Sequence, residues 1–303
     1  MSNDLSAFMH TGEFYAAFCA LLWAAAVILF RRGGERVPPV ALNLFKDAVG
    51  FVLLVATLVA LRVPFDPPSA AVEDWLTLLA SGAMGIGIAD TLFFASLNRL
   101  GAGRSAIVDC LYSPFVLLCS FVYLKEPVGP SLLFAIVMMA AAILVGTWQG
   151  GVGGTAARGR RTRVGVVLGA ASMLIMAAGI VLAKPVLDRS DVLWATTVRM
   201  TGGLAVLGVQ CLSPLRRAQV ASAFRPGPHW RFTLPGSVVG AYLSIVFWTL
   251  GMKYTQTTVA SVLNQLSTVF VMLLAAAVLH ERLGWRQVVA IVFGIAGALV
   301  VTV

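Results

Sequence analysis

The chain has 303 residues, of which 59% are hydrophobic and only 12% are charged. Its mean hydropathy of +0.90 excludes an ordinary soluble domain and indicates a polytopic helical membrane protein. The formal net charge of +9 comes mainly from arginines grouped between apolar runs. This charge therefore favours contact with anionic lipid headgroups rather than with nucleic acid.

Ten apolar segments follow one another along the chain, and each is close to the length of about 20 residues that a bilayer crossing requires. They lie at 12–30, 40–61, 75–97, 104–124, 130–148, 164–184, 192–212, 232–252, 257–279 and 286–303. The sequence therefore predicts an all-α integral membrane protein with ten transmembrane helices. The longest connections are 149–163, which is rich in glycine and arginine, and 213–231, which has four arginines and three prolines. We expect the first to be a flexible linker and the second to be a loop.

The sequence of the first half recurs in the second half. Residues 93–145, moved forward by 155 positions, align with 248–300 without a gap, and the first two spans match at an offset of 153. Each half then has five spans, and because five is odd, the second half must enter the membrane from the opposite side. The pattern predicts two inverted five-helix repeats, at 1–148 and 164–303, joined by the linker at 149–163.

Basic residues give one prediction of the orientation. Fifteen arginines lie in loops that follow odd-numbered spans, whereas five basic residues lie on the other side. By the positive-inside rule the odd loops are cytoplasmic and both termini face outward.

Ionisable groups inside spans cost about 3 kcal/mol each, so they are candidates for function. The first candidate is Asp109, which shares a helical face with Ser105, Tyr112 and Ser113. Its repeat mate, 155 positions later, is Asn264. The two polar faces could line a shared cavity, or they could only hold helices together through hydrogen bonds.

Three further ionisable groups leave two interpretations open. Asp90 follows a run of small residues that predicts close helix packing, and it could exchange a proton or form a salt bridge with Lys46 or Arg199. Lys46 and Arg199 could bind a carboxylate or phosphate of a substrate. They could equally pair with Asp47 and Asp90 to offset the cost of burial.

Four aromatic residues lie near the middle of spans: Trp23, Phe93, Tyr112 and Trp248. They could form the wall of a site for an apolar or aromatic substrate, although aromatic residues in spans also serve as ordinary packing. The sequence contains no Walker loop, zinc helix or complete dinucleotide motif. The four cysteines lie in apolar runs without a close pair. We therefore expect no enzyme activity, no cofactor and no metal site.

The chain resembles the EamA type of the drug/metabolite transporter superfamily over nearly its whole length. The resemblance rests on an acidic residue after the fourth span of each half, on a basic residue in the second span of each half, on a proline in the fourth span and on a tryptophan in the first. These residues are Glu126 in Lys125-Glu126-Pro127, Glu281, Lys46, Arg199, Pro114 and Trp23. The second half departs from the pattern, because Val269 stands where a second proline would be.

The resemblance implies a ten-helix fold with a central cavity lined mainly by helices 1, 3, 4, 6, 8 and 9. It also implies a multi-pass protein of the cell inner membrane that exports or exchanges small metabolites such as amino acids or drugs, often driven by protons. Relatives of this type are expected to have both termini in the cytoplasm, which opposes the orientation predicted from the arginines.

The sequence thus predicts a secondary transporter of small organic metabolites that works by alternating access, as a monomer or homodimer in the lipid bilayer. The candidate site residues are Asp109, Asn264, Asp90, Tyr112, Trp248, Phe93, Trp23, Lys46 and Arg199, with a proton as a possible second ligand. One alternative is a flippase for a lipid-linked sugar or similar amphiphile. Another is a membrane scaffold or sensor that transports nothing.

Overall fold

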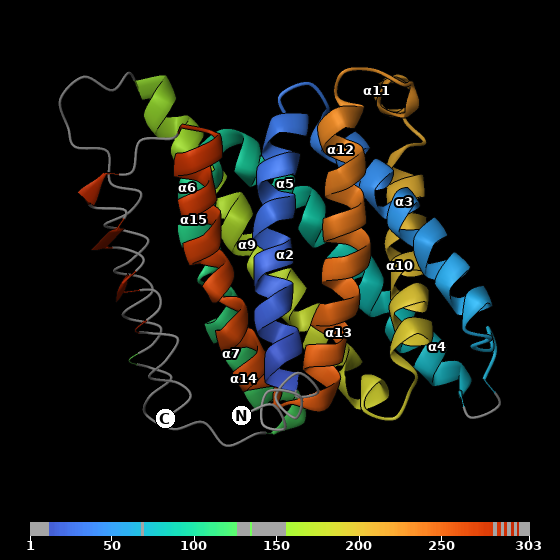
Figure 1. Ribbon diagram of the computed structural model, residues 1–303. Helices are drawn as coiled ribbons and strands as arrows, with labels where there is room; N and C mark the ends of the chain where they lie inside the picture. Colours follow the sequence, from blue (N-terminus) through green and yellow to red (C-terminus); the bar gives the residue numbers. More distant parts are fainter. Residues whose placement is uncertain are drawn as a thin grey trace, which may run out of the picture.

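The computed structural model describes residues 12–67, 70–125 and 156–280, together with positions 134, 284–285, 288–289, 292–293 and 296. All regular structure in these residues is helical (Figure 1). Among the described residues, eight helical spans are long and apolar enough to cross a membrane, and they match the first four predicted spans of each half. The predicted spans 130–148 and 286–303 lie outside the main described ranges, as do Glu126 and Glu281. The ten-helix count therefore stays a prediction.

The first two spans of each half are single helices. In the first half these are α2 (Gly12–Gly33) and α3 (Pro39–Ala60). In the second half they are α9 (Ala156–Leu187) and α10 (Val192–Gln210). Because α9 begins at Ala156, residues 156–163 are helical and do not belong to a flexible linker.

The third span of each half changes in its middle from α-helical to π-helical hydrogen bonding and then back to α-helical. In the first half α4 (Val72–Gly82) continues into the π-helical segment η1 (Ala83–Ala89) and then into α5 (Asp90–Leu100). In the second half α12 (Trp230–Ser237) continues into the π-helical segment η2 (Val238–Ser244) and then into α13 (Ile245–Tyr254). Both ends of η2 lie 155 positions after those of η1, so the repeat seen in the sequence extends to this irregularity.

The fourth span of each half is broken near its middle. Here α6 (Ala102–Asp109) is followed by α7 (Tyr112–Leu124), and α14 (Thr257–Asn264) by α15 (Leu266–Val278). Pro114 explains the first break, because it has no N–H to donate to the carbonyl of Cys110. A tight turn forms instead, in which the N–H of Cys110 donates to Ile107 O at 3.3 Å and that of Leu111 to Val108 O at 3.0 Å.

Corresponding spans of the two halves run in opposite directions. In Figure 1, α4 leads upward into α5, whereas α12 leads downward into α13. Similarly, α6 leads downward into α7, and α14 leads upward into α15. The two halves therefore form one interleaved bundle, with helices of each half packed against helices of the other.

Glycines allow the closest contact between the halves. A Cβ added to Gly82 in α4 would lie 1.7 Å from the carbonyl oxygen of Arg199 in α10. One added to Gly202 in α10 would lie 2.1 Å from the carbonyl oxygen of Leu79. The small residues before Asp90 thus permit the close helix packing that the sequence predicts, and the partner is α10.

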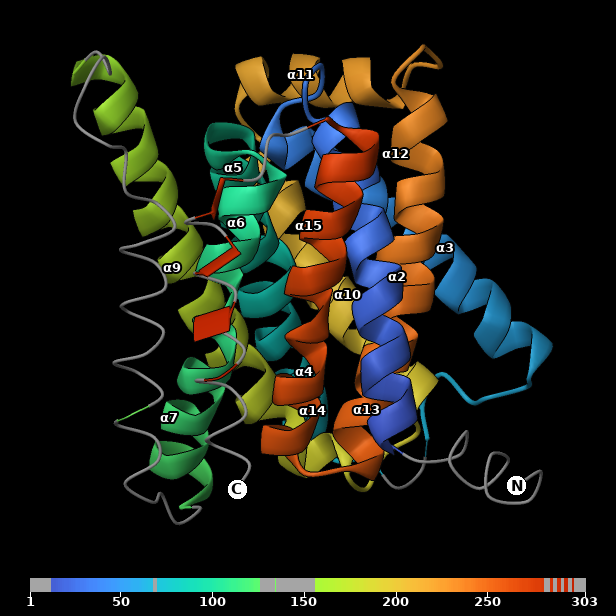
Figure 2. The ribbon, with the colours of Figure 1, turned by 60° about the vertical axis from the view of Figure 1, so that its left-hand side comes forward.

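The stretch 213–231, expected to be a loop, contains the helix α11 (Pro214–Phe224). Figure 2 shows this helix lying across the ends of the spans. Pro214 occupies the start of the helix, a position where the missing N–H costs nothing. The arginines and prolines of this stretch suggested a loop, and for residues 214–224 that prediction was wrong. A proline favours a loop inside a helix, but at position 214 it is a signal for helix initiation.

Candidate functional site

A cavity of about 120 Å³ lies between the two halves. One water molecule needs roughly 10–15 Å³ of such space, so the cavity has room for several waters or a small solute. All nine residues that the sequence singled out line it: Trp23, Lys46, Asp90, Phe93, Asp109, Tyr112, Arg199, Trp248 and Asn264. They come from α2, α3, α5, α6, α7, α10, α13 and α14, so spans 2 and 7 contribute in addition to five of the six helices that the resemblance implied. The sixth, α9, lines the cavity with Met173 and Met176.

A compact ion cluster occupies one side of the cavity. The Nζ atom of Lys46 lies 2.5 Å from Oδ1 of Asp47 and 2.7 Å from Oδ2 of Asp90. All three residues are buried. Two carboxylates around one ammonium offset much of the cost of burying each charge. The sequence left open whether Asp90 exchanges a proton or forms a salt bridge. In the structure Asp90 forms a salt bridge, and its partner is Lys46 rather than Arg199.

Arg199 is buried next to this cluster but is bound differently. Its Nε donates to Oγ of Ser81 at 3.0 Å, and Ser81 in turn donates to the carbonyl of Gly179 at 2.6 Å. Within the described part of the chain, Nη1 of Arg199 has no hydrogen-bond partner and the guanidinium forms no ion pair. The cavity therefore contains a cationic group with an unused N–H.

The two broken spans cross at their breaks. Gln265, which separates α14 from α15, donates from Nε2 to the carbonyl of Cys110 at 3.4 Å and to Oγ of Ser113 at 2.9 Å. It thus supplies the donor that Pro114 cannot. Cys110 and Gln265 lie 155 positions apart, so two repeat mates contact each other across the interface between the halves.

Further hydrogen bonds at this crossing form a reciprocal pair. Oγ of Ser113 donates to the carbonyl of Ser261 at 3.0 Å, and Oγ1 of Thr268 donates to the carbonyl of Ala106 at 3.3 Å. Thr268 is the mate of Ser113, and Ser261 is the mate of Ala106. A contact of one half is therefore repeated with the roles of the halves exchanged, as expected for a two-fold relation.

Asp109 and Asn264 are the last helical residues before the two breaks. Both line the cavity, and Oδ1 of each has no hydrogen-bond partner among the described residues. The hydroxyl of Tyr112, which is also buried, is unpartnered within the same ranges. Buried polar atoms normally have partners, so these three oxygens are open to a ligand or to water.

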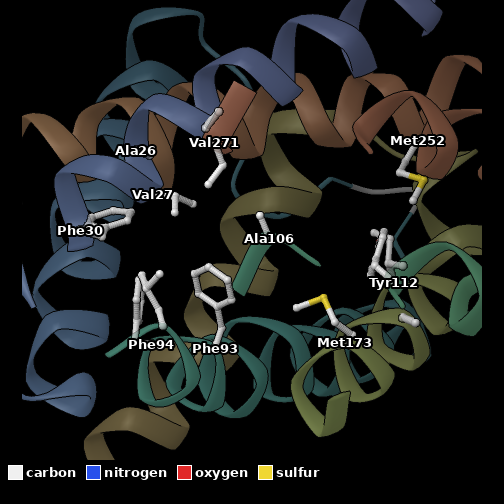
Figure 3. Packing of buried hydrophobic residues seen from close by; sticks show 14 of the residues in the cluster. Ala26, Val27, Phe30, Phe93, Phe94, Ala106, Tyr112, Met173, Met252 and Val271 are labelled. Carbon is white, nitrogen blue, oxygen red and sulfur yellow. The ribbon is translucent and has the colours of Figure 1, made fainter. Parts of the chain in front are cut away.

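Two aromatic pairs line the cavity. The ring centroids of Trp23 and Phe93 are 5.6 Å apart, and those of Tyr112 and Trp248 are 5.8 Å apart. Figure 3 shows Phe93 beside Phe94. Phe93 and Trp248 are repeat mates, so each half contributes one ring of this kind.

Several lining residues were not predicted from the sequence. Gln265 and Ser267 are the mates of Cys110 and Tyr112, so the repeat offset applied to every candidate would have found Ser267 directly. Nothing in the sequence distinguishes Cys19, Met173 or Met176, which also line the cavity, from other apolar residues of their spans.

Comparison with known proteins agrees with this architecture. The EamA-like transporter family matches residues 10–148 and 163–303. Protein PecM of Dickeya dadantii (strain 3937) is 27% identical over 244 residues, which cover 75% of this chain and 74% of that protein. A protein of known crystal structure superposes with a TM-score of 0.66 at 19% identity over 95% of both chains, a likeness of fold. The chain therefore belongs to the EamA-like transporter family of the drug/metabolite transporter superfamily, and it is a multi-pass membrane protein that transports small molecules.

Proposed function

We propose that the protein is a secondary active transporter of the cell inner membrane that moves small organic metabolites, such as amino acids or drugs, by alternating access. The observation that supports this most is the position of the cavity, because it lies where the broken spans of the two halves cross. A solute held there would contact both halves, and a relative movement of the halves would open the site to one side of the membrane or the other. One chain contains the whole site, so a monomer is sufficient for it.

The proposal requires two inverted halves of five helices. The opposite directions of corresponding spans and the reciprocal hydrogen bonds at the crossing support the inversion. The matched π-helical segments η1 and η2 add a second shared irregularity. Irregular backbone at membrane depth is tolerated where it lines a cavity, and residues of both segments do so here.

A proton would act at Asp109 rather than at Asp90. Asp90 accepts a hydrogen bond from Lys46 and is needed to offset that buried ammonium. Asp109 forms no ion pair among the described residues and has an unpartnered oxygen in the cavity. Protonation of Asp109 would therefore not break a salt bridge, which makes it the better candidate for coupling transport to protons or to another cation.

The flippase alternative needs several cationic groups for a phosphate. Lys46 is already bound by two carboxylates, so in the described part of the cavity Arg199 is the cation that retains a free N–H. A single guanidinium in a cavity of about 120 Å³ fits one carboxylate of a small solute better than a lipid-linked diphosphate.

The test is transport by the purified protein. A thermal-shift screen against amino acids, nucleosides and cationic drugs would first identify a ligand, since binding raises apparent stability. Uptake of that ligand into proteoliposomes, with and without a pH gradient, would then measure transport. Asp109→Asn should abolish gradient-driven uptake. Asp188→Asn removes an exposed carboxylate that pairs with Lys184, and it should transport like the wild type.

Two outcomes would contradict the proposal. Ligand binding without uptake in any gradient would favour a scaffold or sensor over a transporter. Undiminished gradient-driven uptake by Asp109→Asn would remove Asp109 from the coupling step.

A further inference from the structure

The crossing of the two broken spans contains a distinct group of oxygen atoms. Asp109 and Asn264 are one pair of repeat mates there, and Tyr112 and Ser267 are another. All four side chains line the cavity. Oδ1 of Asp109, Oδ1 of Asn264 and the hydroxyl of Tyr112 have no partner among the described residues. Buried oxygens of this kind cost free energy unless a ligand satisfies them.

The carboxylate at this crossing forms no ion pair with a described residue. Lys46 is held by Asp47 and Asp90, and Arg199 donates its Nε to Ser81. In the ranges that the structure describes, neither of these cations forms an ion pair with Asp109. One carboxylate in a cavity that is also lined by neutral oxygens suits a cation of charge +1, whereas Ca²⁺ and Mg²⁺ take more oxygen ligands or several bound waters.

An aromatic pair next to these oxygens favours an organic cation over a metal ion. Tyr112 and Trp248 contact edge to face at 5.8 Å, and both line the cavity. The faces of tryptophan and tyrosine attract ammonium groups within about 6 Å, most strongly when water is excluded. The apolar part of an amine would also find Met173 and Met176 on the cavity wall.

We propose that the crossing is a binding site for the ammonium group of an organic amine, with Asp109 as its counter-ion and Asn264 and Tyr112 as neutral partners. The proposal rests on the proposed transport function, because it assigns part of the cargo to these residues. Asp109 supplies the charge. Asn264 and Tyr112 come from opposite halves, so a bound ammonium group would hold the two halves together at the crossing.

The test is direct binding to the purified full-length protein in amine-free phosphate buffer. Isothermal titration with 2-phenylethylammonium chloride should give saturable binding, whereas 2-phenylethanol, its neutral counterpart, should bind at least about tenfold more weakly. A titration with NaCl, followed by the amine in excess NaCl, separates an organic ammonium site from an alkali-ion site. Binding of the amine that NaCl leaves unchanged is the expected result, and equal affinity for Na⁺ would contradict the organic assignment.

Substitutions locate the site within the cavity. Asp109→Asn should lower amine affinity by about tenfold or more, since a charge-assisted contact is lost. Asn264→Asp adds a second carboxylate and should raise the affinity, which a merely structural role for Asn264 would not do. Asp188→Asn is the control with the same change of charge on the surface, and it should bind like the wild type. Unaltered amine binding by Asp109→Asn would overturn the proposal.

The experiments can contradict the proposed amine site and the proposed transport function independently of each other. Amine binding that depends on Asp109, without uptake of any solute, would support the site and contradict the transport function. Uptake of a solute, together with amine binding that is unchanged by Asp109→Asn, would contradict the proposed site and leave the transport function intact. An Asp109→Asn variant that elutes as the wild type does and unfolds at the same temperature or higher shows that lost binding is not lost folding.

Discussion

Two polar regions beside the same cavity differ in how their charges are compensated. In the cluster of Lys46, Asp47 and Asp90, one ammonium contacts two carboxylates at 2.5 and 2.7 Å. At the crossing of the broken spans, the carboxylate of Asp109 forms no ion pair with any described residue. The comparison separates two kinds of buried charge: charges that are paired within the protein, and a carboxylate that has no counter-ion among the described residues. The following predictions test this difference, in order of the expected change in stability.

The largest effect is expected at the close contact between α4 and α10. Gly82→Ala would place a Cβ 1.7 Å from the carbonyl oxygen of Arg199, so α4 and α10 would have to separate. We expect a loss of about 4 kcal/mol or more, seen as a large fall in unfolding temperature or in the yield of monodisperse protein. Gly208→Ala is the matched control on α10, since a Cβ there has nothing within 4 Å. Equal stability of the two variants would contradict the packing described.

Lys46→Met tests the paired cluster itself. The substitution leaves the carboxylates of Asp47 and Asp90 buried without their cation, which should cost about 3–5 kcal/mol. Thermal unfolding in detergent would measure the loss. Adding Asp90→Asn to Lys46→Met should recover part of it, because one uncompensated charge is then removed. A double variant as unstable as the single one would show that the cluster does not act through its charges.

Gln265→Leu tests the crossing at a side chain that already has hydrogen-bond partners in the protein. It removes the donor to the carbonyl of Cys110 and to Ser113, and we expect a loss of about 1–3 kcal/mol in thermal unfolding. Pro114→Ala in the same background should recover some stability, because residue 114 would then have an N–H for the carbonyl of Cys110. No recovery would mean that Pro114 is not the cause of the break.

The smallest change in stability is expected for Asp109→Asn. The substitution keeps the shape of the side chain and removes a buried charge that has no counter-ion among the described residues. The variant should unfold within about 1 kcal/mol of the wild type or be more stable, although its gradient-driven uptake should be abolished and its amine affinity lowered. A destabilisation comparable to that of Lys46→Met would show that Asp109 has a structural partner, and the two regions would then not differ.

The sequence predicted the positions of eight spans and singled out nine residues that line the cavity, because both depend on patterns that can be read from a single sequence. The length of an apolar run indicates a span. Burying an ionisable group in a span costs free energy, and this cost made Lys46, Asp90, Asp109 and Arg199 candidates for function. The repeat offset of 155 positions relates Asp109 to Asn264 directly. These signals are local or repetitive, so a single sequence contains them.

The pairing of the charges could not be predicted in the same way. Asp90 could have joined Lys46 or Arg199, since each of these cations lies in the second span of its half. The choice depends on helix rotation and on the contact of Gly82 with Arg199. The π-helical segments were missed for a related reason. Their residues are ordinary for spans, and their geometry is set by tertiary contacts rather than by local preference.

The hydrogen bonds exchanged between repeat mates have a consequence for energetics. If the two halves were identical, the inward-open and outward-open arrangements of an inverted carrier would be copies of each other and would have equal free energy. At the crossing the mates are unlike: aspartate corresponds to asparagine, cysteine to glutamine, and tyrosine to serine. Under the proposed alternating-access mechanism, these unlike pairs would help to lift that degeneracy, and the empty carrier would then favour one side of the membrane.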